Sequence, residues 1–333
     1  MWDGLRNFFR AGVAFAVLLA IAGSIALAWL LPDDRSQLTV GYQPNLIYLP
    51  VFVADEKGYF REQGLDVKLI KFASAPEMME SLRGGAIDLT GMTSLEVIAR
   101  EAARSAEGDA GATGIKIIVL EVFSPTASPD AILVGNSYPS RDLSGLRGAR
   151  IGVWQGTTIK AYTKLILAKF NITENDISII PLGKAEQLQL LSSGTIDSIF
   201  TFEPTVSVAA RKGIAKVLET APLAKHLFST PRVIYPGGSA VLAEFAGKHR
   251  NAISKYQLAY LKAAAYCREN WNHCMSILAS KTGAEPGDVE GLSRMDWTAF
   301  TADLTNDVDD LLGLFEQEKI TEKRIRAKDL LIE

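Results

Sequence analysis

The chain contains few of the side chains that build metal centres and nucleophilic active sites. It has two cysteines and three histidines in 333 residues, and His226, His249 and His273 all lie in the last third. The sequence has no G-x-S-x-G, H-E-x-x-H, Walker loop or G-x-G-x-x-G pattern, which mark several hydrolases and nucleotide-binding proteins. We therefore predict no enzyme activity, no catalytic residues, no metal and no cofactor.

The chain also lacks an excess of either charge. Its formal net charge is −3, with 22% charged and 48% hydrophobic residues, which is typical of a globular protein of about two domains. A nucleic-acid-binding protein usually carries a marked basic excess. We therefore expect no nucleic acid among the partners.

One long stretch has no charged residue at all. Ala11–Leu31 is uncharged, follows two arginines and precedes Asp33 and Asp34. A run of this length can cross a bilayer as a helix, and the sequence Ala26-Leu27-Ala28 also fits a signal-peptidase site. Residues 1–35 are thus either a cleaved signal sequence or a transmembrane anchor, and both alternatives place the rest of the chain in the periplasm or outside the cytoplasm. We predict an N-terminal hydrophobic helix that contacts the inner membrane through residues 11–31.

The two cysteines, Cys267 and Cys274, are seven residues apart. On one continuous helix this spacing separates them by about 10 Å along the axis, too far for a disulfide. A helix break at the intervening E-N-W-N sequence, with Asn270 or Asn272 as the cap, would bring the sulfurs together. The pair is therefore either a disulfide or two buried thiols, and His273 beside it is a weak metal ligand without a fourth partner.

The chain repeats a pattern at a distance of about 110 residues. S-L-R-G-G-A-I-D ends at Asp88 and L-S-S-G-T-I-D ends at Asp197. Each is preceded by a short apolar strand containing a glycine, a helical stretch, a second strand and a second helix. The pattern predicts two lobes of β-α-β-α-β topology, because strands that alternate with helices form parallel sheets.

After Ser36 the sequence predicts a series of strands and helices that form two lobes. We expect strands at 37–42, 67–72, 87–89, 115–123 and 131–134, and helices at 46–60 and 74–85, with Ser74 as a cap. The chain after Ala246 is expected to be mostly helical. Lobe one then comprises 38–129 plus 237–333 and lobe two comprises 130–236, joined by two crossing strands.

The candidate ligand site follows from the carboxyl ends of the expected strands, where open α/β sheets bind ligands. Six segments lie there: 41–45, 72–76, 90–94, 122–126, 154–158 and 201–204. They are rich in Gly, Ser, Thr and Asn, and most of them open a helix, whose free N–H groups favour an anion or a polar acceptor. Within these segments the predicted ligand-binding residues are Tyr42, Trp154, Gly156, Thr157, Thr158 and Glu203.

Three kinds of contact are expected in this site. Gly156, Thr157 and Thr158 offer hydroxyl and N–H groups at one helix start, in either capping or ligand binding. Aromatic side chains can pack on a flat ligand, and Glu203 can accept from a ligand amine or brace the following helix. The segments contain no Lys or Arg, which favours a larger, aromatic or neutral ligand over a small bare anion.

Several of these stretches resemble a known family. V-G-Y-Q-P-N-L-I-Y-L-P at 40–50, R-I-G-V-W-Q-G-T-T at 150–158 and L-S-S-G-T-I-D-S-I-F-T-F-E-P at 191–204 are similar to the substrate-binding proteins of nitrate, taurine and alkanesulfonate ABC importers. The same family (SsuA/THI5-like, NMT1-like) includes binders of the thiamine pyrimidine precursor and fungal pyrimidine synthases. The resemblance covers about 38–333.

The resemblance implies a type II periplasmic-binding-protein fold that closes two lobes on a small solute, of sulfonate, taurine, nitrate or aminopyrimidine type. It also implies an ABC permease and its ATPase as partners and a monomer as the default. By the family pattern, the predicted ligand-binding residues further include Gln43, Asn45, Ser74, Thr93 and Phe123, and the same pattern places Gly156, Thr157 and Glu203 on ligand-facing segments. Two alternatives are a membrane-tethered solute sensor and a pyrimidine-synthase-like enzyme. The enzyme branch uses Cys and His near its site, whereas this chain has no Cys before 267 and no His before 226.

Overall fold

The computed structural model describes residues 35–106 and 114–332. The chain divides into two units, Met1–Arg35 and Ser36–Glu333, and everything below concerns the second unit. The predictions of a hydrophobic helix and membrane contact at 1–35 therefore lie outside the described residues, apart from Arg35. Among the described helices, none combines the length and the apolar character that a membrane span requires.

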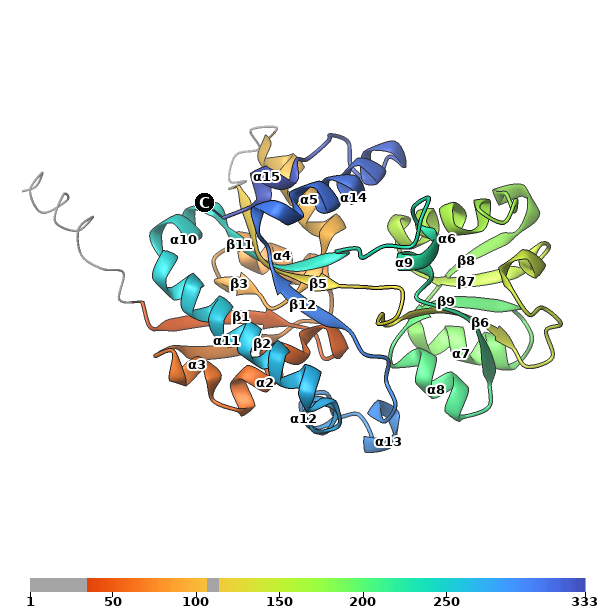
Figure 1. Ribbon diagram of the computed structural model, residues 1–333, viewed down its shortest axis with the longest axis horizontal. Coiled ribbons are helices and arrows are strands. Elements are labelled where there is room, and N and C mark those ends of the chain that lie inside the picture. The colour runs from red at the N-terminus through yellow and green to blue at the C-terminus, as the bar shows by residue number, and fades with distance from the viewer. Residues whose placement is uncertain (1–34, 107–113, 333) are drawn as a thin grey trace, which may run out of the picture. The chain divides into compact units, whose positions relative to one another are not determined.

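Two separate β-sheets organise Ser36–Glu333 as an α/β fold (Figure 1). The first sheet has the order β12-β5-β11-β3-β1-β2, with β4 paired to β11, and the second has the order β10-β6-β9-β7-β8. The strands of the first sheet are β1 (Gln37–Tyr42), β2 (Asp66–Lys71), β3 (Leu89–Thr90), β4 (Thr93–Ser94), β5 (Ile115–Val122), β11 (Gly237–Leu242) and β12 (Asp296–Ala299). Those of the second are β6 (Asp130–Gly135), β7 (Arg150–Trp154), β8 (Ser178–Leu182), β9 (Ser198–Phe202) and β10 (Ala215–Thr220).

Helices connect and cover these strands. The longer ones are α2 (Leu49–Glu56), α4 (Ala75–Arg83), α5 (Leu95–Ala106), α6 (Thr157–Ala168), α7 (Lys184–Ser192), α11 (Arg250–Glu269), α12 (Trp271–Thr282) and α14 (Thr305–Gln317). The shorter ones are α3 (Tyr59–Glu62), α8 (Thr205–Arg211), α9 (Pro222–His226), α10 (Ala243–Lys248), α13 (Pro286–Val289) and α15 (Ala327–Leu330), with 3-10 turns η1 (Leu46–Tyr48), η2 (Leu143–Leu146), η3 (Glu174–Asp176) and η4 (Ala302–Leu304).

The two copies of the sequence repeat have the same topology. β1 pairs in parallel with β2 and β3, and β7 pairs in parallel with β8 and β9. The terminal aspartate of each copy has an equivalent partner, a backbone N–H of the first strand. Asp88 Oδ2 accepts from Thr39 N at 2.7 Å, and Asp197 Oδ2 accepts from Arg150 N at 2.8 Å. Each aspartate thereby ties the end of the repeat to the start of its first strand.

A glycine in each first strand serves the same packing purpose. A Cβ on Gly41 would lie 2.6 Å from Ile87 Cδ1, and one on Gly152 would lie 2.8 Å from Ile196 Cδ1. Such distances are far inside normal carbon contact, so a side chain in either position displaces its neighbour. The glycines let the isoleucine that precedes each terminal aspartate pack directly on the strand.

Two segments connect the sheets, between β5 and β6 and between α9 and β11. They pair with each other through two backbone hydrogen bonds, Phe123 N to Ile234 O at 3.0 Å and Ile234 N to Phe123 O at 2.9 Å. This pairing fits the two crossing strands expected from the sequence. The stated lobe limits themselves stay a prediction.

The structure differs from two local expectations and adds a detail to a third. The helix expected over 46–60 is interrupted at Lys57 and Gly58, because Gly58 takes φ 74°, a conformation that ends α2 before α3 begins. The mostly helical C-terminal part also contains β12, which pairs with β5 at the sheet edge. Asn270 separates α11 from α12 as expected, but its amide donates to Tyr266 O and does not cap α12.

Cys267 and Cys274 are both buried and free, which corresponds to the second of the two alternatives for this pair. The helix break at Asn270 allows the side chains to meet, and a thiol–thiol hydrogen bond and burial raise the pKa of Cys267. The two sulfurs thus lie in the buried core, among the helices that pack on the first sheet. No group of three or more His, Cys, Asp and Glu side chains positioned for a metal occurs in the described ranges 35–106 and 114–332.

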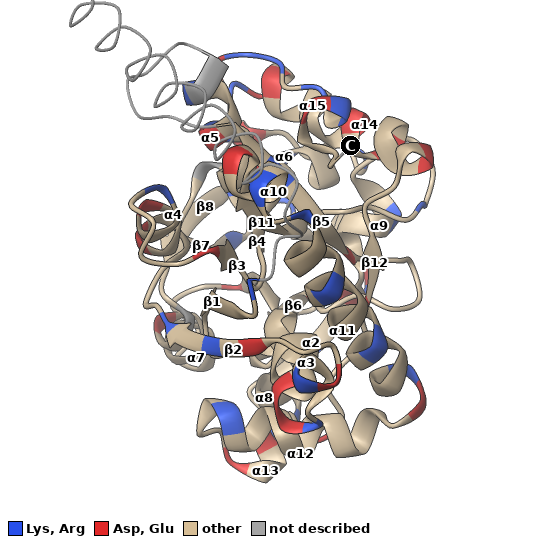
Figure 2. Cartoon of the chain, turned by 90° about the vertical axis from the view of Figure 1, so that its left-hand side faces the viewer, with Lys and Arg blue, Asp and Glu red and all other residues tan. Residues whose placement is uncertain are grey.

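Charges of both signs are interspersed along the face shown in Figure 2. Acidic and basic residues alternate on the outer helices, and several form helix-surface pairs such as Lys248 with Glu244 and Arg100 with Glu96. Positions of both signs are thus mixed along the described elements in this view, as the small net charge of −3 also indicates.

Candidate ligand-binding site

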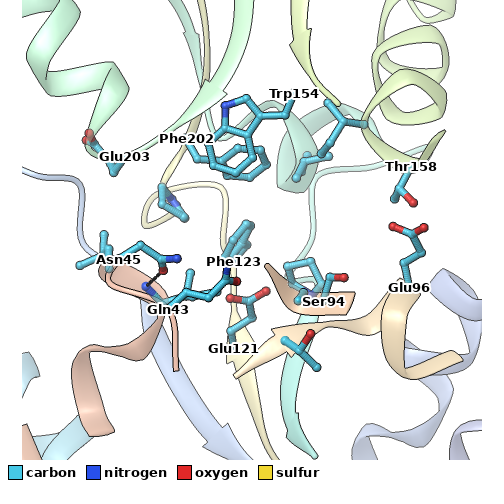
Figure 3. A pocket seen from close by; sticks show the side chains of 18 of the residues that line it. Gln43, Asn45, Ser94, Glu96, Glu121, Phe123, Trp154, Thr158, Phe202 and Glu203 are labelled. Carbon is cyan, nitrogen blue, oxygen red and sulfur yellow. Dashed lines mark hydrogen bonds between the residues drawn. The ribbon is translucent and has the colours of Figure 1, made fainter. Parts of the chain in front are cut away.

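A cavity of about 450 Å³ lies where the ends of the strands of the two sheets meet. Its walls come from both sheets and from the segments that join them (Figure 3). A volume of this size accommodates a small organic molecule. Figure 3 shows Trp154, Phe202 and Glu203 on one side of the cavity and Gln43, Asn45 and Glu121 on the other.

Eight of the eleven residues predicted from the sequence line this cavity. They are Gln43, Asn45, Ser74, Thr93, Phe123, Trp154, Thr158 and Glu203. Tyr42 and Gly156 are not among the described residues that line it. Tyr42 packs edge-to-face against Phe52 with the ring centroids 5.2 Å apart, Gly156 is the N-cap of α6 with φ 140°, and Thr157 is the first residue of α6. A role in ligand binding stays a prediction for all eleven.

The polar side chains at the helix starts are occupied by capping bonds. Asn45 Oδ1 accepts from Ile47 N at 3.2 Å, and Ser74 Oγ accepts from Glu77 N at 3.3 Å. Ser94 caps α5 by accepting from Val97 N at 3.4 Å. The capping role expected for Ser74 is confirmed, and these three side chains position the wall before any ligand is present.

The helix ends that face the cavity differ in their charge. α4 has Glu77 in its first turn and α5 has Glu96, so a carboxylate already compensates each positive dipole end. α6 has neither an acidic residue in its first turn nor a side-chain cap. Of these three helix starts, the one at Gly156–Thr158 is therefore the one whose positive dipole end has no carboxylate in its own first turn.

Aromatic rings form one side of the cavity. Trp154 and Phe202 lie with their ring centroids 4.8 Å apart, and Phe123 lies 6.5 Å from Phe202. The three residues come from β7, β9 and the segment after β5. They give the cavity an apolar aromatic wall whose rings are tilted by 41° between Trp154 and Phe202 and by 51° between Phe123 and Phe202, and aromatic ring faces also attract cations.

A buried glutamine orients the tryptophan. Gln187 on α7 is fully buried, and its Oε1 accepts from Trp154 Nε1 at 3.1 Å and from Thr201 Oγ1 at 2.9 Å. Its Nε2 donates to Phe200 O at 3.3 Å. Sequence reasoning missed Gln187 because it lies mid-helix, with no signal of the strand-end contacts that it makes.

Replacing Gln187 with Leu is expected to lower the free energy of unfolding by about 2–4 kcal/mol, since it removes a buried acceptor shared by two donors. Urea unfolding measures the change. Gln189→Leu on the exposed face of the same helix is the matched control, with an expected change within about 0.5 kcal/mol. Equal stabilities of the two variants would contradict the bracing role of Gln187.

Glu203 is held by three hydrogen bonds within the structure. Its carboxylate accepts from Ser207 N at 3.0 Å and Ser207 Oγ at 2.9 Å, and it also accepts from Ser293 N at 2.9 Å. Ser207 lies in α8, and Ser293 lies in the segment between α13 and β12. Of the two roles considered for Glu203, these contacts match the bracing one.

The acid that sequence reasoning missed is Glu121, the penultimate residue of β5. It lines the cavity, is 5% exposed, and its Oε2 has no hydrogen-bond partner. Burial, and then the charge of Asp130, raise the pKa of Glu121 to about 8. The predicted segment began one residue later, at Val122. The available signal was a lone acid within the apolar strand I-K-I-I-V-L-E-V.

Two more buried hydroxyls face the cavity without a partner. Thr93 Oγ1 and Thr158 Oγ1 have no hydrogen-bond partner, and their residues are 2% and 7% exposed. Buried polar atoms are nearly always bonded. Together with Glu121 they surround one cavity, Thr93 and Glu121 from the first sheet and Thr158 from α6, which indicates groups that a bound molecule would satisfy.

The described part of the chain places no positive side chain on the cavity wall. The lining includes Glu96, Glu121 and Glu203 but no Lys, Arg or His, and no Cys. This agrees with the absence of Lys and Arg from the six segments identified in the sequence. The cavity has hydrogen-bonding, aromatic and acidic groups with which to recognise a ligand.

Comparison with known proteins identifies the class. The sequence model of the NMT1-like family matches residues 32–278. This is about three quarters of the chain, and the chain belongs to the NMT1-like family.

Individual relatives are distant. A protein of Bacillus subtilis (strain 168) named "Putative aliphatic sulfonates-binding protein" is 25% identical over 334 residues, covering 96% of this chain and 93% of the relative. A 4-amino-5-hydroxymethyl-2-methylpyrimidine phosphate synthase of Saccharomyces cerevisiae is 24% identical over 194 residues. That match covers 58% of this chain and about half, 54%, of the synthase.

The fold resembles that of periplasmic binding proteins. The crystal structure of the periplasmic aliphatic sulphonate binding protein SsuA from Escherichia coli superposes with a TM-score of 0.73 at 18% identity, covering 90% of this chain and 93% of SsuA. At this identity the likeness establishes the α/β fold with two sheets. It does not carry the ligand over to this chain.

Proposed function

We propose that the protein is the extracytoplasmic substrate-binding component of an ABC importer, with a type II periplasmic-binding-protein fold. The observation that carries the proposal is the 450 Å³ cavity, whose walls come from both sheets. The two sheets are joined by crossing segments paired at Phe123 and Ile234. A clamp of this construction closes by a hinge motion around a ligand.

The names of the relatives support the same function. The Bacillus subtilis relative is named as a sulfonate-binding protein, and the Escherichia coli neighbour is titled a periplasmic sulphonate-binding protein. On this proposal the lobes are 38–129 plus 237–333 and 130–236, and the partners are an ABC permease and its ATPase. Residues 11–31, uncharged in the sequence, direct export as a cleaved signal or remain as an inner-membrane anchor.

A thermal-shift screen of the chain with sulfonates, taurine, nitrate, aminopyrimidines and organic amines tests the proposal. A solute that binds only the folded state stabilises it by about 3 kcal/mol at a hundredfold excess over Kd. We expect such a shift for one chemical class, together with a smaller radius of gyration in X-ray scattering as the lobes close. Stabilisation without any compaction would favour a static binding site over a clamp.

The similarity to a yeast synthase raises an enzyme as the second candidate. The described residues that line the cavity include neither His nor Cys, and that branch of the family is expected to use both. Incubation of the protein with iron and candidate substrates, followed by mass spectrometry, separates the two. Turnover of a substrate would replace the binding-protein proposal.

A further inference from the structure

The three carboxyl groups on the cavity wall are in different states. Glu203 is held by three hydrogen bonds from Ser207 and Ser293. Glu96 pairs with Arg100 on its own helix at 2.9 Å. Glu121 has neither a hydrogen-bond donor at its buried Oε2 nor a cation among the residues that line the cavity. It is therefore the one of the three that a ligand can engage without breaking an existing contact.

The surrounding backbone makes room for the Glu121 carboxyl. Glu121 pairs in register with Trp297 of β12, and Gly237 at the start of β11 lies beside its head group. A Cβ on Gly237 would stand 2.4 Å from Glu121 Oε1 and 2.6 Å from Thr93 O. Figure 3 shows the carboxyl projecting between Gln43 and Ser94 towards the cavity. The sheet thus presents this acid at the cavity floor, below the aromatic wall.

The ionisable groups around Glu121 are acids and phenols. Asp130 contributes a negative charge that acts on Glu121, and Lys225 lies near Asp130, whose pKa burial raises to about 6. Tyr48 and Tyr260 are buried with Glu121 among their electrostatic neighbours. Tyr162 on the cavity wall has Glu96 and Glu121 as neighbours. These surroundings favour an incoming positive charge and disfavour a negative one.

The aromatic wall favours the same kind of ligand. Trp154 and Phe202 stand with their ring centroids 4.8 Å apart, and Phe123 extends the wall towards Glu121 in Figure 3. Rings attract a cation through their electron-rich faces, most strongly when water is excluded. A carboxylate together with aromatic faces is the common protein environment of an organic ammonium group.

We propose that Glu121 receives a positively charged nitrogen of the ligand, so that the cavity selects organic amines or amidines over oxyanions. The inference rests on the proposed binding-protein function and names the substrate class of that site. It departs from what the names of the sulfonate-binding relatives would suggest. Thr93 and Thr158, whose buried hydroxyls lack partners, are placed to bond the uncharged part of the same ligand.

The opposite arrangement is a protonated Glu121 that donates a hydrogen bond to an oxyanion. The substitution Glu121→Gln separates the two, because an amide is neutral and still donates. It preserves binding of an acceptor ligand and removes the charge that an ammonium needs. Glu186→Gln is the matched control, since Glu186 is exposed and is not among the described residues that line the cavity.

The experiment uses the full chain in mild detergent and three probes that share one skeleton, 2-phenylethylamine, 2-phenylethanol and 2-phenylethanesulfonate. Calorimetric titration is expected to show the amine binding at least about tenfold more tightly than the sulfonate. Glu121→Gln is expected to weaken amine binding by about 30-fold or more, and Glu186→Gln by less than about fivefold.

The pH dependence gives an independent readout. Glu121 must lose its proton to pair with the ammonium group. The ammonium group itself stays charged between pH 6 and 8. With the pKa of Glu121 near 8, amine affinity is expected to rise by up to tenfold per pH unit between pH 6 and 8 and then to level off. An oxyanion held by protonated Glu121 would lose affinity above pH 8.

The outcomes are distinct. Amine binding that Glu121→Gln leaves intact, or no amine binding at all, overturns the inference. Tight sulfonate binding with compaction of the protein also overturns it, while leaving the importer function in place. The importer function fails separately, if no solute of the broader panel stabilises the protein or compacts it.

Discussion

Replacing Glu121 with Gln is expected to stabilise the protein at alkaline pH by several kcal/mol. Burial and the charge of Asp130 raise the pKa of Glu121 in the folded state from 4.5 to about 8. The folded protein therefore holds a proton that the unfolded chain has released, and the free energy of unfolding falls as pH rises from about 4.5 to about 8. Each unit of pKa difference corresponds to about 1.4 kcal/mol, so the gain for Glu121→Gln at pH 9 is on the order of 3–5 kcal/mol.

Urea unfolding of both proteins at pH 4 and pH 9 measures this effect. At pH 4 the carboxyl is neutral in both states, and the variant and the parent should differ by less than about 1 kcal/mol. The difference in the free energy of unfolding between variant and parent should grow from pH 4 to pH 9. The variant's own pH profile should lack the fall that Glu121 causes in the parent. An equal difference at both pH values would mean that Glu121 keeps an ordinary pKa in the folded protein.

Replacing Glu203 with Ala is expected to lower the free energy of unfolding by about 3–5 kcal/mol. The 4% exposed carboxylate accepts three hydrogen bonds, two from Ser207 and one from Ser293 N. Hydrogen bonds to a charged group contribute about 1.5–3 kcal/mol each and are not strictly additive. Both the start of α8 and the segment before β12 lose their partner in this variant.

Glu186→Ala is the matched control, because Glu186 also caps a helix through one bond from Gly183 N at 2.7 Å but is exposed. Its expected cost is about 0.5–1 kcal/mol. Thermal and urea unfolding of the two variants give the comparison. A cost for Glu203→Ala no larger than that for Glu186→Ala would show that the Glu203 contacts contribute little to stability.

Local sequence signals predicted the elements whose causes are local. The strand at Gln37–Tyr42 has the predicted bounds, and Ser74 caps α4 as its position before Pro76 and Glu77 indicates. The repeated I-D motif predicted two equivalent units, and in the structure Asp88 and Asp197 make equivalent bonds. Such features follow from backbone capping and short-range packing, which a few neighbouring residues determine.

Elements that depend on distant partners were less predictable. β12 is only four residues long and lies among helices, and it forms because β5 offers it a free sheet edge. The interruption of the helix expected over 46–60 depends on one glycine at positive φ. A short strand or a one-residue break leaves little periodicity in the sequence.

The candidate site shows the same division. Segments at the ends of strands brought eight of the eleven predicted residues to the cavity, because the topology rule for parallel sheets applies to any sequence that forms them. Glu121 and Gln187 were missed, since each reaches the site from inside a strand or a helix. The two roles of Glu203 were equally open in the sequence, and its contacts with Ser207 and Ser293 distinguish them.

By itself the sequence determined the class of this protein: an α/β chain of two repeated units with polar, glycine-containing turns after its strands. These properties arise from apolar periodicity and turn chemistry, which are local. The tertiary structure alone decided which polar groups lie buried without a partner at the cavity. Burial and isolation of Glu121 depend on β11, β12 and Asp130, which lie far from it along the chain or in the other sheet. The electrostatic character of the site is a property of that assembly, because a side chain's charge state follows from its surroundings.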